Sequence, residues 1–264
     1  MNNYSPGFMA NESICRNLVD RLVAPGFRNE NTLGDGNVAI LAAHSERTAL
    51  TTASFISPDG ADAVNTVANR LLSVGAFPRW LTLSLRIGDN ADDALPAELT
   101  SRIGEAARLA ETEIVSADMG CDDIELTLTA LGIVRPEIDI DPGCAESGDA
   151  VILTGAVGSG SASLGDIVAG VFDVATPRAM SVPGRGGLEE AFADLRRLTG
   201  MEITVDRRAV PITAALATSG AAVMNTPCRG IMIIVVDSEK APEALAACRR
   251  SAHGSSAAVI GRVG

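Results

Sequence analysis

Aromatic side chains are scarce in this 264-residue chain, where they make up 3% of the residues and include one tryptophan and one tyrosine. Proteins that bind single-stranded nucleic acid stack bases on aromatic rings, and contacts with phosphate backbones require clustered Lys and Arg. The formal net charge of this chain is instead −12. We therefore expect no nucleic acid among its partners, and a core built from aliphatic side chains.

Long apolar runs and zinc-ligand spacings are also missing. No run approaches the roughly 20 apolar residues that span a bilayer, and the first residues lack a basic segment followed by an apolar one. The five cysteines form no CxxC pair and are accompanied by only two histidines, His44 and His253, which argues against a structural zinc site or a catalytic triad. We expect a cytoplasmic protein with reduced thiols and no membrane association.

What is present is the composition of a globular protein, with 47% hydrophobic and 20% charged residues. The acidic, turn-rich segment Pro136–Gly148 divides the chain, and we predict domains at 1–141 and 142–264. In the first half the hydrophobic periodicity predicts helices over residues 11–25, 64–72 (ended by Gly75) and 96–112, and strands over 38–42, 48–56, 81–87, 113–118 and 124–130. In the second half it predicts strands over 150–154, 202–205, 231–236 and 257–260, a loop over 178–187, an apolar helix after the glycine-rich turn at 155–165, and helices over 188–198 and 242–251.

The strands of the first half alternate apolar and polar residues, so each has one buried side. Such a sheet is covered by helices on one face, and its other face needs a partner. Because most soluble oligomers are symmetric homo-oligomers, we predict a homodimer through the N-terminal sheet.

Two glycine-rich turns are candidate anion sites. Residues Gly155–Gly160 (GAVGSG) follow a predicted strand and precede a helix, where backbone amides can hold phosphate, although the turn is neither GxGxxG nor followed by a P-loop lysine. A tight strand–helix turn is the alternative interpretation. The run Arg185-Gly186-Gly187 opens a helix and offers a guanidinium with unhindered amides, or else is a flexible loop.

Two carboxylates are candidate Mg²⁺ ligands. Asp35 lies in the turn before Val38, and Asp118 follows the apolar pair Ile114-Val115, so both are expected at strand ends. Oxygen ligands of this kind suit Mg²⁺. In an acidic protein, solvated turn residues are the competing interpretation.

Several segments, taken in order, resemble the HypE-type hydrogenase-maturation proteins of the AIR synthase (PurM-like) superfamily. They are TTASFISP, NTVANRLLSVGAFPRWLTLSL, EIVSAD, GDAVILTGAVGSGSASL, PGRGGLEEAFADL, RRAVPI, the run Val223–Asn225 and AAVIGRV. The resemblance implies a two-domain α/β (α+β) fold whose N-terminal sheets pair into a dimer barrel. It also implies ATP and Mg²⁺ as cofactors, phosphorylated intermediates, and, in HypE itself, dehydration of a thiocarboxamide on a C-terminal cysteine.

The chain departs from the family pattern where ligands are expected. Ala53 and Arg70 stand where the resemblance implies carboxylates, and the family's Gly-Asp-Thr is Ala117-Asp118-Met119. The family's Asp-Pro-Thr-Arg-Gly-Gly is residues 182–187 here, its Asp-His-Gly is reduced to Ser159-Gly160, and its Asn-Glu-Gly is residues 225–227. Carried over by position, the resemblance implies cofactor contacts from Asn69, Arg70, Asp118, Arg185, Gly186, Gly187 and Asn225, and a metal contact from Asp118. Asp35, taken from its place in the turn, is the second candidate metal ligand.

Three hypotheses follow. The first is a HypE-like protein with an eroded Mg·ATP site, because replacing two carboxylates by Ala53 and Arg70 changes the local charge by about three units. It would bind a nucleotide or small anion and could work beside a protein partner in a maturation or biosynthetic pathway. The second is an active ATP-dependent enzyme that uses Asp35, Asp118, Asp122 and Asp123 for metal and residues 185–187 for phosphate. The third is a purely structural heteromeric partner. No cysteine tail follows the last predicted strand, so we expect that the HypE reaction does not occur on this chain.

Overall fold

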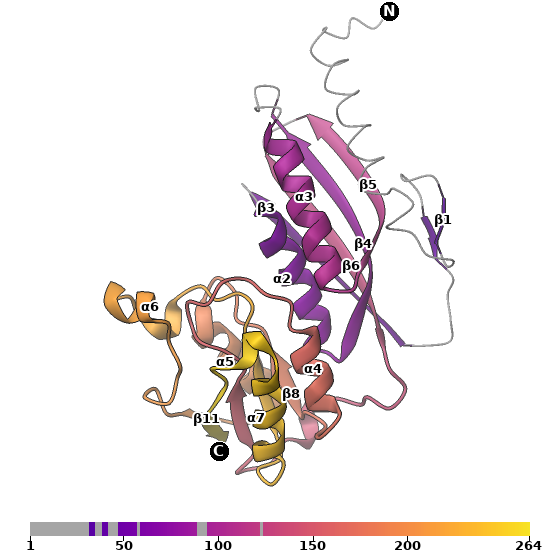
Figure 1. Ribbon diagram of the computed structural model, residues 1–264. Helices are drawn as coiled ribbons and strands as arrows, with labels where there is room; N and C mark the ends of the chain where they lie inside the picture. Colours follow the sequence, from indigo (N-terminus) through magenta and orange to yellow (C-terminus); the bar gives the residue numbers. More distant parts are fainter. Residues whose placement is uncertain (1–31, 35–38, 42–46, 57–58, 89–93, 122–123) are drawn as a thin grey trace, which may run out of the picture. The chain divides into compact units, whose positions relative to one another are not determined.

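The computed structural model describes residues 32–34, 39–41, 47–56, 59–88, 94–121 and 124–264 (Figure 1). These residues form two compact units. The first contains the described residues up to Ala68 and those of the segment Pro78–Ile133, and the second contains Asn69–Phe77 and Val134–Gly264. The helical segment predicted at residues 11–25 and the residues Asp35, His44, Asp122 and Asp123 lie outside the described part. The domain boundary at 141/142 remains a prediction.

The first unit is built on a four-stranded sheet in the order β3-β6-β4-β5. The alternation of buried and half-buried residues along β6 confirms the expected one-sided strand. Helices α2 and α3 lie over the same face of this sheet (Figure 1). The bounds are β3 Arg47–Ile56, α2 Gly60–Leu72, β4 Ala76–Ile87, α3 Ala94–Leu109, β5 Glu113–Cys121 and β6 Glu125–Val134, with β1 (Thr32–Gly34) and β2 (Ala39–Leu41) paired separately.

Local capping fixes where α2 begins and ends. The Asp59 side chain accepts hydrogen bonds from the backbone N–H groups of Ala61 and Asp62, at 3.0 and 3.1 Å, and so satisfies donors that the first turn leaves free. At the other end Gly75 has a φ of 73° and donates to the carbonyl of Leu72, as the sequence predicted for a glycine stop.

Helix α3 is shorter than the sequence predicted and ends at Leu109 rather than Thr112. The reason is Glu111, which has a φ of 52°, while the N–H of Thr112 donates to the carbonyl of Ala107 at 2.9 Å. This is the Schellman arrangement that usually carries glycine at the left-handed position. A glutamate there gave no stop signal in the sequence.

The other face of the first sheet carries a row of hydroxyl groups. Thr52 contacts Thr129 at 2.9 Å between their Oγ1 atoms, and Ser54 contacts Thr127 at 2.7 Å. On the same alternate positions of β3, Leu50 and Ile56 are 64% and 81% exposed. The predicted homodimer through this sheet stays a proposal, and these residues are where it can be tested.

The second unit is a five-stranded sheet with helices on both faces. Its order is β8-β10-β7-β11-β9, and each neighbouring pair of strands is antiparallel. One core cluster joins the sheet to α4 and α7, and the other joins it to α5. The bounds are β7 Ala150–Leu153, α4 Gly165–Phe172, β8 Ala179–Ser181, α5 Gly187–Thr199, β9 Ile203–Val205, α6 Ala214–Ser219, β10 Ile233–Val236, α7 Ala241–Arg250 and β11 Ala258–Val263, with three-residue 3₁₀ turns at 142–144 (η2), 223–225 (η3) and 252–254 (η4).

Two elements of the second unit were missed. The segment 178–187, predicted as a loop, contains β8, whose three buried residues pair with β10. Three residues are too few to show a period of two, and the prolines at 177 and 183 indicated a loop. Helix α6 begins at Thr213, whose side chain accepts from the N–H of Leu216, and it buries no residue, so no apolar face announced it.

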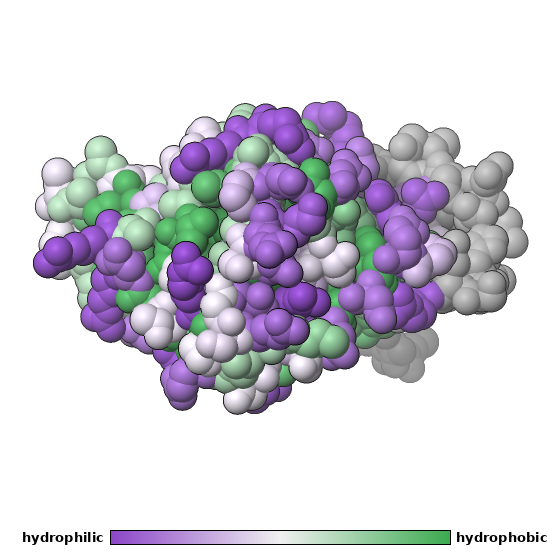
Figure 2. All heavy atoms as spheres, turned by 90° about the horizontal axis from the view of Figure 1, so that it is seen from below, coloured by the Kyte–Doolittle hydropathy of each residue, from purple (hydrophilic) through white to green (hydrophobic). Residues whose placement is uncertain are grey.

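Among the described residues, no helix combines the length and apolarity needed to cross a bilayer. The face in Figure 2 is mainly hydrophilic, with apolar residues in small separate groups.

Candidate functional site

The glycine-rich turn between β7 and α4, residues 155–164, is the first part of the candidate site, and we call it the glycine loop. Its entry is held by a backbone bridge: the N–H of Val157 donates to Pro211 at 2.9 Å, and the N–H of Thr213 donates to Val157 at 3.0 Å. Gly158 has a φ of 88°, and a Cβ there would lie 2.7 Å from the Oγ1 of Thr213. This close approach explains the glycine.

The exit of the glycine loop is held by the side chain of Asn69, which comes from α2. Its Nδ2 donates to the carbonyl of Ala162 at 2.9 Å, and its Oδ1 accepts from the N–H of Leu164 at 3.0 Å. Asn69 is 1% exposed, so both hydrogen bonds are buried. Gly230 touches the same segment, because a Cβ on it would lie 2.4 Å from the nitrogen of Ala162.

Between these two fixed ends, the loop exposes Gly158, Ser159 and Gly160. The N–H and the hydroxyl of the exposed Ser159 both donate to the carbonyl of Ala156, at 3.1 and 2.7 Å. A Cβ on Gly160 would meet nothing within 4 Å, so the tip is open. An open turn of small residues can bring backbone N–H groups against an anion.

The Arg185-Gly186-Gly187 turn is already occupied in part by the protein's own carboxylate. The N–H of Gly186 donates to the Oε2 of Glu190 at 2.9 Å. Gly187 has a φ of 69° and packs against the 224–226 turn, where a Cβ would lie 2.6 Å from the carbonyl oxygens of Met224 and Thr226. Gly187 is therefore needed for close packing, and Glu190, which the sequence analysis missed, competes for anions at this turn. Its local signal was the pair of acidic residues, Glu189 and Glu190, in the first turn of α5.

The remaining predicted ligands divide between the two units. Two of them belong to the second unit and are exposed. Arg70 follows Asn69 on α2, and Asn225 adjoins Gly187. Asp118 belongs to the first unit and is exposed. It lies inside β5, opposite Ser84, and not at a strand end as predicted, because the strand continues to Cys121.

The described residues do not fit a Mg²⁺ ion. Over the described ranges there is no group of three or more His, Cys, Asp or Glu side chains placed to hold a metal. Ala53 offers no ligand, Arg70 is a cation, and Asp118 alone is an incomplete donor set for an ion that takes oxygen ligands. Asp35, the other predicted ligand, lies outside the described residues.

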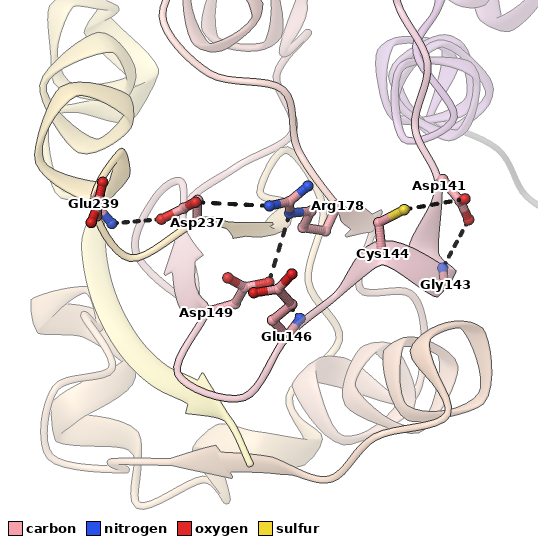
Figure 3. Close-up of polar contacts among 8 residues, drawn as sticks. All are labelled: Asp141, Gly143, Cys144, Glu146, Asp149, Arg178, Asp237 and Glu239. Atoms are coloured by element: carbon pink, nitrogen blue, oxygen red, sulfur yellow. Dashed lines mark hydrogen bonds and ion pairs between the residues drawn. The ribbon is translucent and has the colours of Figure 1, made fainter.

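A second polar cluster surrounds Arg178 and was not found from the sequence (Figure 3). Its guanidinium lies 3.9 Å from the Oδ2 of Asp149 and 3.7 Å from the Oδ2 of Asp237. It adjoins a shallow pocket of about 360 Å³ lined by Phe172, Val174, Ala175, Thr176, Arg178, Asp237 and Lys240. Two carboxylates balance the Arg178 charge, so the cluster ties the ends of β7, β8 and β10 together rather than offering a free cation.

Cys144 lies beside Arg178 in this cluster (Figure 3). Its thiol donates to the Oδ2 of Asp141 at 3.3 Å, and this hydrogen bond, together with the negative charge of Asp141, raises the pKa of Cys144 above its usual value. A raised pKa lowers the thiolate fraction, and the thiolate is the reactive form. The geometry therefore argues against a nucleophilic role for this exposed cysteine.

Comparison with known proteins gives two family matches that together cover well over half of the chain. Residues 38–134 match the N-terminal domain of AIR synthase related proteins, and residues 175–264 match the C-terminal domain. Among curated proteins, the carbamoyl dehydratase HypE of Rhodobacter capsulatus is 25% identical over an alignment of 277 positions, which covers 90% of this chain and 81% of the relative.

Solved structures share the fold. The crystal structure of the hydrogenase maturation protein HypE in complex with ATP has a TM-score of 0.84 at 24% identity and covers 99% of this chain and 88% of its own. The HypE–HypF complex gives a TM-score of 0.76 at 21% identity, covering 93% and 92%. The chain therefore belongs to the AIR synthase related family, as a HypE-like protein with the PurM-like fold.

Proposed function

We propose that this chain binds a nucleotide or another small anion at the glycine loop of its second unit, without a resident Mg²⁺ ion, and serves a maturation pathway of the hydrogenase type. The loop is braced at both ends and open at its tip, which suits a ligand that accepts hydrogen bonds. HypE, whose fold it shares, has been solved with ATP, and the curated relative is a carbamoyl dehydratase.

The observation that carries the proposal is the exposed Arg70, one residue after Asn69 on α2. The family resemblance implies a carboxylate at this position, which would attract Mg²⁺. A guanidinium repels a metal ion and attracts phosphate, which it can also hold by two parallel hydrogen bonds. The change favours direct binding of an anion over binding of a metal–nucleotide complex.

A protein partner is part of the proposal. HypE has been solved in complex with HypF, and the matched chain of that structure has a TM-score of 0.76 to this chain. We propose that this chain also works within a protein complex. Its partner would bind the anion-bound form of this chain and the anion-free form with different affinities.

Isothermal titration calorimetry with ATP, ADP and inorganic phosphate, each with and without Mg²⁺, tests the proposal. We expect binding of at least one of these anions with an affinity that Mg²⁺ leaves unchanged or weakens. Micromolar binding of Mg·ATP with turnover to ADP would instead support an active ATP-dependent enzyme with relocated ligands. No binding under any condition would overturn the proposal.

A further inference from the structure

We infer that Asn69 is a positioning residue for the anion-binding glycine loop and does not contact the ligand itself; this inference rests on the proposed function. The side chain is 1% exposed, and each end of its amide is bonded to the loop backbone, at 2.9 Å to Ala162 and 3.0 Å to Leu164. The family resemblance had placed Asn69 among the cofactor contacts. Its burial leaves it no open path to a ligand.

The chemistry of the contact requires an amide. Ala162 presents a carbonyl, which needs a donor, and Leu164 presents an N–H, which needs an acceptor. A carboxylate offers acceptors only, so one oxygen would face the Ala162 carbonyl without a hydrogen between them. An apolar side chain would leave both buried backbone groups unpaired, which costs more than the hydrogen bonds themselves contribute.

The loop depends on this contact because its two ends are held differently. The entry is fixed by the backbone bridge between Val157 and the Pro211–Thr213 segment, which does not involve α2. The exit at residues 162–164 is held by the Asn69 side chain, with Gly230 packed against it. Loss of the amide would therefore release the exit while the entry stays in place.

The same contact relates Arg70 to the loop. Asn69 and Arg70 are consecutive in α2, so the hydrogen bonds of Asn69 also fix the backbone of Arg70 relative to residues 162–164. If an anion is held jointly by the loop tip and by Arg70, a change of Asn69 would leave these two groups no longer fixed relative to each other. Misplacement of otherwise intact groups is the expected signature of a lost positioning residue.

The first test needs no ligand. Hydrogen exchange of backbone amides is measured in the wild type, in Asn69→Ala and in Ser73→Ala, a control that removes a hydrogen bond from the same helix, between the Ser73 hydroxyl and the Arg70 carbonyl at 2.8 Å. We expect the Leu164 amide to exchange at least about tenfold faster in Asn69→Ala, with the Ile234 amide of β10 unchanged. Equal exchange at Leu164 in all three proteins would contradict the inference.

The second test measures affinity for ATP and inorganic phosphate by calorimetry. We expect about tenfold weaker binding in Asn69→Ala and wild-type binding in Ser73→Ala. Asn69→Asp adds a signature that a purely structural role would lack. When the introduced carboxyl is protonated, it donates to Ala162 and accepts from Leu164 as the amide does, so its affinity relative to wild type should recover as the pH falls from 8 to about 5.

The outcomes separate the two proposals. If the wild type binds no anion, the proposed function fails, while the exchange of Leu164 still reports whether Asn69 holds the loop. If the wild type binds but the affinities of Asn69→Ala and Asn69→Asp match it, the positioning role is wrong and the proposed function stands. If Asn69→Ala does not fold, the pH dependence of Asn69→Asp decides, and a profile parallel to that of wild type would overturn the inference.

Discussion

The carboxylate of Glu190 accepts a hydrogen bond from the backbone N–H of Gly186 at 2.9 Å, so the turn that opens α5 already contains an anion. If Arg185–Gly187 contacts phosphate, as the resemblance implies, the ligand must compete with this carboxylate. We expect Glu190→Ala to raise the affinity for inorganic phosphate and to lower the free energy of unfolding by about 1 kcal/mol, through loss of the cap.

The matched control is Glu189→Ala. It removes the same charge from the same helical turn, but the Glu189 carboxylate pairs with Arg207 at 3.3 Å, while the Gly186 N–H donates to Glu190. Equal affinities of the two variants would show that the effect is general electrostatics. A lower phosphate affinity in Glu190→Ala than in wild type would contradict competition at this turn.

Gly187 is predicted to be needed for packing as well as for its backbone conformation. We expect Gly187→Ala to destabilise the protein by more than about 2 kcal/mol, because the new Cβ would lie 2.6 Å from two carbonyl oxygens at a φ of 69°. Gly200, at the other end of α5, has the same φ of 69° with nothing within 4 Å of its Cβ position. Gly200→Ala should therefore cost only the conformational strain, about 1 kcal/mol. Urea unfolding of both variants measures the difference, and equal losses would show that the clash is relieved.

Arg70 should contribute to anion affinity through its charge. We expect Arg70→Met to weaken ATP binding about threefold to tenfold at low salt, and the difference from wild type should shrink as ionic strength rises. Arg79→Met, at an exposed position of β4, removes the same charge from the first unit and should leave affinity nearly unchanged. A loss that persists at high salt would indicate a packing role for the Arg70 side chain.

The open face of the first sheet should be where two copies of the chain meet. We expect Leu50→Asp and Ile56→Asp to shift sedimentation from dimer to monomer, because each places a charge among residues that dimerisation would bury. Val74→Asp is the control, since Val74 is 53% exposed but belongs to the second unit. A wild type that is monomeric at all concentrations would overturn the predicted homodimer.

Two buried thiols should make stability depend on pH in the alkaline range. Burial raises the pKa of Cys228 and of Cys248 from 9.0 to about 11. Unfolded thiols lose their protons at lower pH than folded ones, so this contribution is fully present below pH 9, falls as the pH rises, and is lost by about pH 11. We expect the free energy of unfolding to fall less steeply across this interval in Cys248→Ala than in wild type. Identical slopes would show that the Cys248 thiol is not protected by burial.

Much of the fold was predictable because local signals agreed with tertiary packing. The apolar period of α2 and its glycine stop at Gly75, and the alternation of β6, appear in the structure as predicted. The exceptions were elements without such signals. Glu111 takes a conformation that glycine usually supplies, and β8 is too short to show a period. The first is held by hydrogen bonds to its own helix and the second by pairing with β10, and neither interaction leaves a pattern in the residue types.

The candidate site was less predictable, because its contacts join residues far apart in the chain. The family resemblance grouped Asn69 with Arg70 as ligands, whereas the structure buries Asn69 and exposes Arg70. Adjacent residues on a helix point about 100° apart, so Asn69 can be buried against the loop while Arg70 is exposed. The Glu190 carboxylate at Gly186 and the Arg178 cluster had only weak local signals.

The sequence alone determined the family, the aliphatic core, and the order of the principal helices and strands. It also determined that positions 53 and 70 carry alanine and arginine in place of carboxylates. Each of these depends on residue identity and short-range pattern. The tertiary structure decided what the site residues do. The amide of Asn69 meets a loop more than 90 residues away. Which donor finds which acceptor across that separation depends on how the elements pack. The stretch around α2 is thus the support of the glycine loop, with Arg70 as its exposed cation.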